Sequence, residues 1–318
     1  MKNLDIIALG GNAILPAGKP GTIGEQVAIT RTAMMEIEGL VAAKRQVVLT
    51  HGNGPIVGNI VMRNEAIKED IPPMPLDVCG ADSQGGIGYM IQQTLANVLH
   101  EKGRAKEVVS VVTQVVVDAD DPAFENPVKP IGPFYSAEDA KKLAQMAGWN
   151  VVEDSNRGYR RVVPSPYPIE IVEINAVKRL IEAGVIVITV GGGGIPVVKR
   201  NGLYEGIEGV IDKDHASSLL GRELGAERLI IVTSVDAVYV DFGKPTARPL
   251  PETTVSELRS LFEQGQFPPG SMGSKIQAAI DFVESGGSSA IITDPGNLLE
   301  AVAGQKGTTI RKHLANGD

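Results

Sequence analysis

The chain repeats one unit: a short apolar run rich in valine and isoleucine, a glycine-rich turn, and a segment with helical periodicity. Such alternation is typical of an α/β protein with a mainly parallel, open sheet. Because the runs are apolar throughout, helices should cover both faces of the sheet, as in a three-layer α/β/α sandwich. The expected strands are residues 6–9, 47–50, 108–112, 185–189, 229–233 and 290–293.

One stretch, residues 118–168, breaks this rhythm because it gathers prolines and aromatic residues. Covering helices are expected on either side of it in the sequence, over residues 27–44 and 276–283. Long insertions in compact domains are often functional. We therefore expect an inserted lid subdomain, the alternative being a surface excursion without a role.

The composition limits the partners of the chain. A net charge of −8 over 318 residues argues against an extended nucleic-acid surface, so an anionic ligand must be held locally. The one cysteine, Cys79, excludes an intrachain disulfide and favours a reducing compartment, with the cytoplasm as the expected location. Neither a signal peptide nor an apolar run of the ~20 residues needed to span a bilayer is visible, so no membrane partner is expected.

Three lysines lie on glycine-rich or turn-like segments: Lys129, Lys213 and Lys275. Lys213 lies between two aspartates where a helix is expected to begin, so Asp214 should cap that helix and Lys213 should stay protonated. Lys275 follows Gly-Ser-Met-Gly-Ser at another helix start, although the spacing does not fit a P-loop. A solvated charged turn is the alternative around Lys213, but together the lysines predict a phosphate site and phosphoryl transfer.

Glycine turns follow several expected strands. Gly10-Gly11-Asn12 follows the first, Gly52-Asn53-Gly54 the second, and residues 191–194 are four consecutive glycines after a later strand. Open α/β folds bind ligands at this edge, and glycine lets backbone N–H groups approach an anion. Ordinary tight turns, or a close chain crossing at the four glycines, are the alternatives. We favour a packing or hydrogen-bonding role for His51 over that of a catalytic base.

Several other chemistries find no support. The chain has no Gly-x-Ser-x-Gly elbow of a serine hydrolase, and its four histidines show no zinc-ligand spacing. The first glycine turn also departs from the dinucleotide-binding pattern.

Taken together, the motifs resemble those of the carbamate kinases, within the amino-acid-kinase fold, over nearly the whole chain. The segment around Lys129 resembles the protruding subdomain that distinguishes carbamate kinases from their relatives. The resemblance rests on residues 8–13, 50–55, 88–93, 121–124, 129–135, 160–166, 210–214 and 270–275.

The resemblance implies a reversible phosphoryl transfer between ATP and carbamate, giving ADP and carbamoyl phosphate. It also implies ATP synthesis during arginine catabolism and a homodimer. Residues 1–205 would form an N-terminal lobe that binds carbamate or carbamoyl phosphate and carries the insertion, and residues 206–318 a C-terminal lobe that binds the nucleotide.

The resemblance also assigns residues to each role. The catalytic set would be Lys129, Lys213, Asp214 and Lys275. The substrate turns would be Gly10, Gly11, Asn12, Gly52, Asn53 and Gly54. The nucleotide contacts would be Thr233, Ser234, Val235, Asp236, Met272, Gly273 and Lys275.

No carboxylate cage for a metal is visible in the sequence, so Mg²⁺ is expected to bind mainly through the nucleotide phosphates. Ser274 stands where many relatives have proline, a departure that removes no charge. The alternatives are an acetylglutamate kinase-like or UMP kinase-like enzyme of the same fold, and a non-catalytic nucleotide sensor. A sensor would be expected to lose one of the three lysines, and all three are present.

Overall fold

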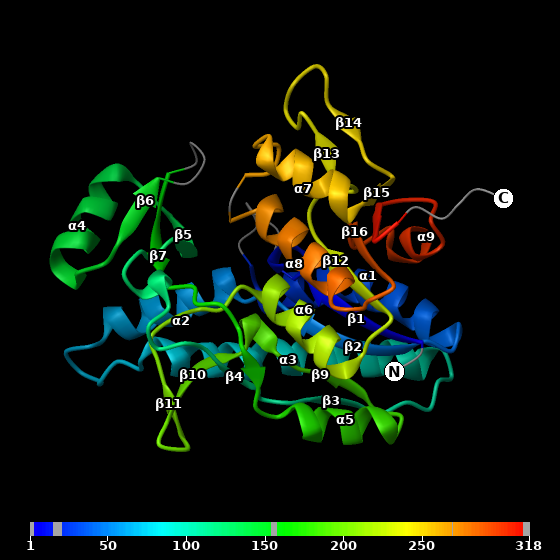
Figure 1. The fold of residues 1–318 in the computed structure, drawn as a ribbon. Helices are drawn as coiled ribbons and strands as arrows, with labels where there is room; N and C mark the ends of the chain where they lie inside the picture. The colour runs from blue at the N-terminus through cyan, green and yellow to red at the C-terminus, as the bar shows by residue number, and fades with distance from the viewer. Residues whose placement is uncertain (1–2, 15–20, 154–157, 269, 314–318) are drawn as a thin grey trace.

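A central eight-stranded sheet organises the computed structural model, which describes residues 3–14, 21–153, 158–268 and 270–313 (Figure 1). The strand order is β15-β17-β16-β12-β1-β2-β9-β3, and every neighbouring pair is parallel except β16 and β17. The strands are β1 (Leu4–Leu9), β2 (Gln46–His51), β3 (Val108–Ser110), β9 (Ile186–Ile188), β12 (Arg228–Val232), β15 (Glu252–Thr254), β16 (Ser289–Thr293) and β17 (Thr308–Arg311). All six predicted strands therefore belong to this sheet.

Helices cover both faces of the sheet. On β1, Ile7 and Leu9 pack into one buried cluster and Ile6 and Ala8 into another, as alternation along a strand requires. The first cluster includes residues of α1 (Ile23–Ala42), α3 (Leu76–Glu101) and α9 (Leu298–Val302). The second includes residues of α5 (Ile174–Glu182), α6 (Lys213–Leu224), α7 (Val255–Glu263) and α8 (Met272–Glu284). The expected three-layer α/β/α architecture is confirmed.

A second, four-stranded sheet has the order β11-β10-β4-β8. Its strands are β4 (Gln114–Val116), β8 (Glu170–Ile171), β10 (Ile195–Arg200) and β11 (Leu203–Gly206). A short pair, β13 (Tyr239–Val240) and β14 (Arg248–Pro249), lies near α7 in Figure 1. None of the helices in the described ranges is both long enough and apolar enough to cross a bilayer.

The insertion leaves the body after β4 and returns at β8, and these two strands are antiparallel neighbours. It contains the turn η2 (Pro122–Phe124), β5 (Lys129–Tyr135), α4 (Ala137–Ala147), β6 (Val151–Glu153) and β7 (Tyr159–Val163). Its three strands form a separate sheet in the order β5-β7-β6, to the left of the main sheet in Figure 1. At its base β5 rests on α2 (Gly54–Ala66), where a Cβ on Gly58 would lie 2.0 Å from the Cα of Gly132. Only glycine at position 58 permits this close backbone contact.

Candidate active site

The first two glycine turns lie side by side at the carboxyl edge of the main sheet, because β1 and β2 are parallel and in register from Leu4 to Leu9. The N–H of Gly10 donates to the carbonyl of Val232 (2.8 Å), and that of Gly52 to the carbonyl of Leu9 (2.9 Å). A Cβ on Gly10 would lie 2.7 Å from the Val232 oxygen, so a larger residue would push the turn away from β12.

The four-glycine turn joins them after β9. Gly192 has φ +67°, and a Cβ there would lie 2.2 Å from the amide nitrogen of Asn53. That amide is buried and donates to the hydroxyl of Ser83 (2.8 Å). The three turns are therefore in one place, and glycine at position 192 is required by a neighbouring side chain.

The start of α6 brings the charged groups to this edge. The helix is capped by Asp212, whose side chain accepts from the N–H of Asp214 (2.8 Å), so the expectation that Asp214 is the cap was wrong. Asp214 lies in the first turn instead. Its carboxylate accepts from both Lys213 and Lys275, the latter at 2.9 Å.

Burial and pairing act in opposite directions on these groups. Burial lowers the pKa of Lys213 despite the charge of Asp214 beside it. Burial also disfavours the charge on Lys275, but the charge of Asp214 and its hydrogen bond outweigh it and raise the pKa of Lys275. Burial opposes the ionised form of Asp214 too, yet the two lysines hold its pKa below the usual range. One buried carboxylate thus holds two ammonium groups at the floor of the site.

Lys129 reaches this cluster from the insertion. Its ammonium donates to the carboxylate of Asp212 at 2.5 Å. Burial opposes the charge on Asp212, but Lys129 and its neighbours lower the pKa of that carboxyl. The structure therefore brings together all three lysines, which come from β5, α6 and α8.

These groups surround a cavity of about 300 Å³. Of the predicted residues, those lining it are Gly11, Gly52, Asn53, Gly54, Lys129, Lys213, Asp214 and Lys275. Asp212, Gly192 and Arg160 also line it. Arg160 donates from Nε to the carbonyl of Gly132 (3.1 Å), and its guanidinium lies over the ring of Phe134. The cavity wall is therefore charged and glycine-rich.

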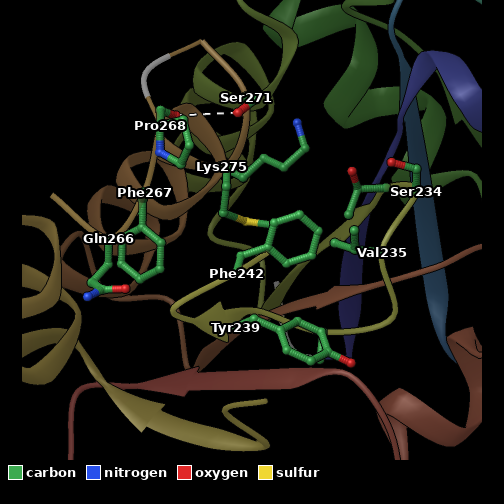
Figure 2. Close-up of a pocket in the computed structure, with 12 residues that line it drawn as sticks. Ser234, Val235, Tyr239, Phe242, Gln266, Phe267, Pro268, Ser271 and Lys275 are labelled. Carbon is green, nitrogen blue, oxygen red and sulfur yellow. Dashed lines mark hydrogen bonds between the residues drawn. The ribbon is translucent and has the colours of Figure 1, made fainter. Parts of the chain in front are cut away.

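A second cavity of about 400 Å³ adjoins the first and shares Lys275 with it. Figure 2 shows the ring of Phe242 between Ser234 and Val235 on one side of this cavity and Phe267 on the other, with Tyr239 below Phe242 in the view. The rings of Tyr239 and Phe242 meet edge to face, with centroids 5.9 Å apart. Of the predicted nucleotide contacts, those lining it are Thr233, Ser234, Val235, Met272 and Lys275.

Among the described predicted residues, Gly10, Asp236 and Gly273 line neither cavity, and the side chain of Asn12 lies outside what the structure describes. Gly10 precedes and Asn12 lies within the turn η1 (Gly11–Ala13). Asp236 accepts from the hydroxyl of Tyr239 (3.1 Å), so it supports a ring of the second cavity. Gly273 lets α8 begin against the preceding chain, because a Cβ there would lie 2.9 Å from the carbonyl oxygen of Pro268.

His51 is buried beside the site, and burial lowers its pKa to about 4. Its Nδ1 lies 3.2 Å from the carbonyl oxygen of Gly52. The imidazole is therefore neutral near pH 7 and packed against the Gly52 turn, which supports the structural role over that of a base.

The donor set does not form a dedicated metal centre. Across residues 3–14, 21–153, 158–268 and 270–313, no three or more His, Cys, Asp or Glu side chains are grouped to hold an ion. Asp212 and Asp214 are the carboxylates at the cavity, and both are paired with lysines. A divalent cation at this site would have to take its ligands mainly from a bound phosphate.

Sequence reasoning missed Asp212, Arg160, Tyr239 and Phe242 as site residues. A signal existed for Asp212, because it precedes Lys213 directly and an aspartate one residue before a helix is a common N-cap. Nothing in the local sequence distinguishes Tyr239 and Phe242 from other aromatic residues on short strands and loops.

Comparison with known proteins agrees with this geometry. A model of the amino acid kinase family matches residues 3–294. The chain is 47% identical to the carbamate kinase of Pyrococcus horikoshii over 307 residues, which is 96% of this chain and 98% of that protein. It is 45% identical to the carbamate kinase of Trichomonas vaginalis, again over 96% of this chain and 98% of that protein.

Solved structures give the same result. Carbamate kinase from Giardia lamblia bound to citric acid superposes with a TM-score of 0.93 at 43% identity, covering 98% of both chains. The same enzyme bound to AMP-PNP has a TM-score of 0.89 at 44% identity, with the same coverage. An N-acetylglutamate synthase from Neisseria gonorrhoeae, at 16% identity and a TM-score of 0.59, shares the fold alone.

The chain therefore belongs to the amino acid kinase family, in its carbamate kinase branch.

Proposed function

We propose that the protein catalyses reversible phosphoryl transfer between ATP and carbamate, giving ADP and carbamoyl phosphate. One observation carries the proposal. Three lysines from three separate elements meet at one small cavity, and one of them, Lys275, also lines the adjoining aromatic cavity. That arrangement suits a nucleotide whose base occupies the aromatic cavity and whose phosphates extend over Lys275 toward Lys213.

Carbamate is an oxyanion, so its attack on phosphorus needs no proton removed from the nucleophile. The site is consistent with this chemistry, because the imidazole of His51 beside the Gly52 turn is buried and engaged with that turn. What the reaction needs instead is the alignment of two anions that repel each other, and stabilisation of charge on the transferring group.

The residues of the cavity supply these requirements. Backbone N–H groups of the turns at Gly11 and Gly52 would hold the carboxylate of carbamate. Lys213 and Lys275 would contact the nucleotide phosphates, while Asp214 keeps the two ammonium groups in place. Lys129 would approach from the insertion, exchanging its bond to Asp212 for the transferring phosphoryl group.

Mg²⁺ would accompany the nucleotide and neutralise part of its phosphate charge. We infer that it binds mainly through phosphate oxygens, because both carboxylates at the cavity are already paired with lysines.

The deciding experiment measures ATP formation from ADP and carbamoyl phosphate by the purified protein. Parallel reactions offer acetylglutamate or UMP as acceptors for ATP. Rapid ATP formation with carbamoyl phosphate, and no turnover of the other two acceptors, is expected. Turnover of acetylglutamate or UMP instead would transfer the assignment to another kinase of the fold, and inactivity with every substrate would favour a nucleotide sensor.

We further propose that the enzyme works in the cytoplasm, in the direction of ATP synthesis during arginine catabolism, as a homodimer.

The surface of the chain bears on the homodimer. Exposed apolar side chains gather along α2, α3 and their connection, at Met62, Ile67, Ile71, Met74, Val78 and Tyr89. Such a patch fits a second copy of the chain. Light scattering of the wild type and of Tyr89→Glu tests whether the protein is a homodimer. Loss of the dimer in the variant is the expected result.

A further inference from the structure

Besides the Gly58–Gly132 and Lys129–Asp212 contacts, the insertion touches the body through Tyr167, which lines a small cavity together with Lys129 and Asp212. Tyr167 lies in the segment that returns from β7 to β8, and its hydroxyl donates to Oδ2 of Asp281 on α8 at 2.7 Å. Its ring packs on that of His215 on α6, with centroids 5.0 Å apart. Burial and the hydrogen bond to Asp281 raise the pKa of Tyr167, so the phenol remains a neutral donor.

Tyr167 also holds the two ends of the insertion together. Its backbone N–H donates to Oδ2 of Asp121 at 2.8 Å, and the other oxygen of Asp121 caps the turn η2 at Ala123. Asp121 lies on the outgoing segment and Tyr167 on the returning one. Tyr167 therefore links the outgoing and returning segments of the insertion, which together form its stem, and also links this stem to the body.

The helices that Tyr167 contacts are those that hold the phosphate lysines. Asp281 lies six residues after Lys275 on α8, and His215 lies two residues after Lys213 on α6. Lys129, at the start of β5, bonds to Asp212, the cap of α6. That contact must rearrange if Lys129 is to bind substrate, whereas the Tyr167 contact includes no group of the lysine cluster.

We propose that Tyr167 is a positioning residue: through Asp281 and Asp121 it fixes the stem of the insertion on α6 and α8, and so sets where Lys129 meets the transferring phosphoryl group. The inference rests on the proposed role of Lys129. It predicts that removing the Tyr167 hydroxyl weakens the contribution of Lys129 while leaving the nucleotide cavity intact, because no described residue of the insertion lines that cavity.

The test compares Tyr167→Phe, which keeps the ring against His215, with the wild type. We expect kcat/KM for carbamoyl phosphate to fall roughly 3- to 10-fold and KM for ADP to stay unchanged. In a Lys129→Met background the same change should cause no further loss, since the residue through which it acts is gone. The control is Tyr204→Phe on β11, a comparably exposed tyrosine that packs on Lys199, and it should behave as wild type.

A second measurement does not depend on the reaction. Amide hydrogen exchange in β5 and β7 should be faster in Tyr167→Phe, and equally so in Asp281→Ala, with the double variant no faster than either. Unchanged exchange in the insertion would overturn the inference whatever the activity, as would a loss of activity that persists without Lys129. If exchange in the insertion rises as expected in Tyr167→Phe but the wild type makes no ATP from carbamoyl phosphate, the proposed function fails. The inference that Tyr167 holds the insertion on α6 and α8 then still stands.

Discussion

At the scale of single residues, Asp214 explains how two ammonium groups can share one small cavity. It is 2% exposed and accepts from Lys213 with one oxygen and from Lys275 with the other. Without it, two like charges would face each other in a desolvated site. With it, both are placed before the phosphates arrive, so little reorganisation is left for the reaction.

Removing either ammonium group should therefore abolish most of the activity. We expect Lys213→Ala and Lys275→Ala each to lower kcat by at least ~100-fold, the scale of losing a preorganised charge contact. The measurement is steady-state ATP formation, with circular dichroism to show that the variants are folded. Wild-type turnover in either variant would remove the basis of the assignment.

The pH dependence of the free enzyme should carry the signature of Lys213. Because burial lowers the pKa of Lys213, its charge is lost, as the pH rises, earlier than that of an ordinary lysine. We expect kcat/KM for carbamoyl phosphate to fall on the alkaline side below the usual lysine range. Asp214→Asn removes the negative charge that raises the pKa of Lys213, so the alkaline limb should shift to lower pH. A shift to higher pH would contradict this account.

At the scale of elements, the insertion contributes one charge to a site built otherwise by the body. Lys129 lies at the start of β5 and bonds to the cap of α6, 83 residues away in the sequence. We expect Lys129→Ala to impair turnover of carbamoyl phosphate and to leave binding of ADP nearly unchanged, as measured by calorimetric titration. An unaltered kcat/KM would mean that the insertion does not act as a lid.

The turn after β9 offers a second test at this scale. Gly192 and Gly103 have the same φ of +67°, but a Cβ would meet Asn53 at position 192 and nothing within 4 Å at position 103. The cost of the left-handed backbone, about 1–2 kcal/mol, is thus common to Gly192→Ala and Gly103→Ala. We expect only Gly192→Ala to lose activity as well, because it displaces Asn53 in the cavity wall. Equal activity of the two variants would show that the Asn53 contact is dispensable.

At the scale of the whole molecule, the sequence predicted the parallel strands well because each is a continuous apolar run. The helix α3 was not predicted, since Gly80, Gly85, Gly86 and Gly88 disfavour a helix by propensity alone. Tertiary packing overrides propensity there: a Cβ on Gly88 would lie 2.1 Å from the hydroxyl of Ser110, so glycine lets α3 pack closely on β3. The antiparallel β17 is a short strand of mixed polarity whose direction no local pattern encodes.

The residues of the candidate site also fall into two groups, those that a local sequence pattern predicts and those that it does not. Glycine turns and lysine motifs are local, and the turns at Gly10 and Gly52 lie at the carboxyl edge of the sheet, where the sequence predicts them. The pairing of Lys129 with Asp212 and the aromatic wall at Tyr239 and Phe242 depend on chain segments that only the folded molecule brings together. A single sequence does not show which of its distant segments come together in space.

At the end of the sheet opposite the site, ion pairs rather than glycine turns connect the central strands. Asp5 on β1 is fully buried and accepts two hydrogen bonds each from Arg45, just before β2, and from Arg228 on β12. One carboxylate thus joins the three central strands.

Breaking that network should lower stability without changing the chemistry. Asp5→Ala takes their shared carboxylate from two largely buried guanidinium groups, leaving Arg45 its weaker pair with Glu227 at 3.2 Å, and breaking a buried pair typically costs about 3–5 kcal/mol of unfolding free energy. The matched control is Glu284→Ala, which removes the partner of Arg259 in an exposed pair and should change stability little. Thermal unfolding of the two variants should differ by several degrees, while kcat per folded molecule stays the same in both, because Asp5 lies at the edge of the sheet remote from the lysine cluster. An equal melting temperature in the two variants would mean that Asp5 does not stabilise the central strands, whereas a lower kcat in Asp5→Ala alone would mean that the two edges of the sheet are coupled.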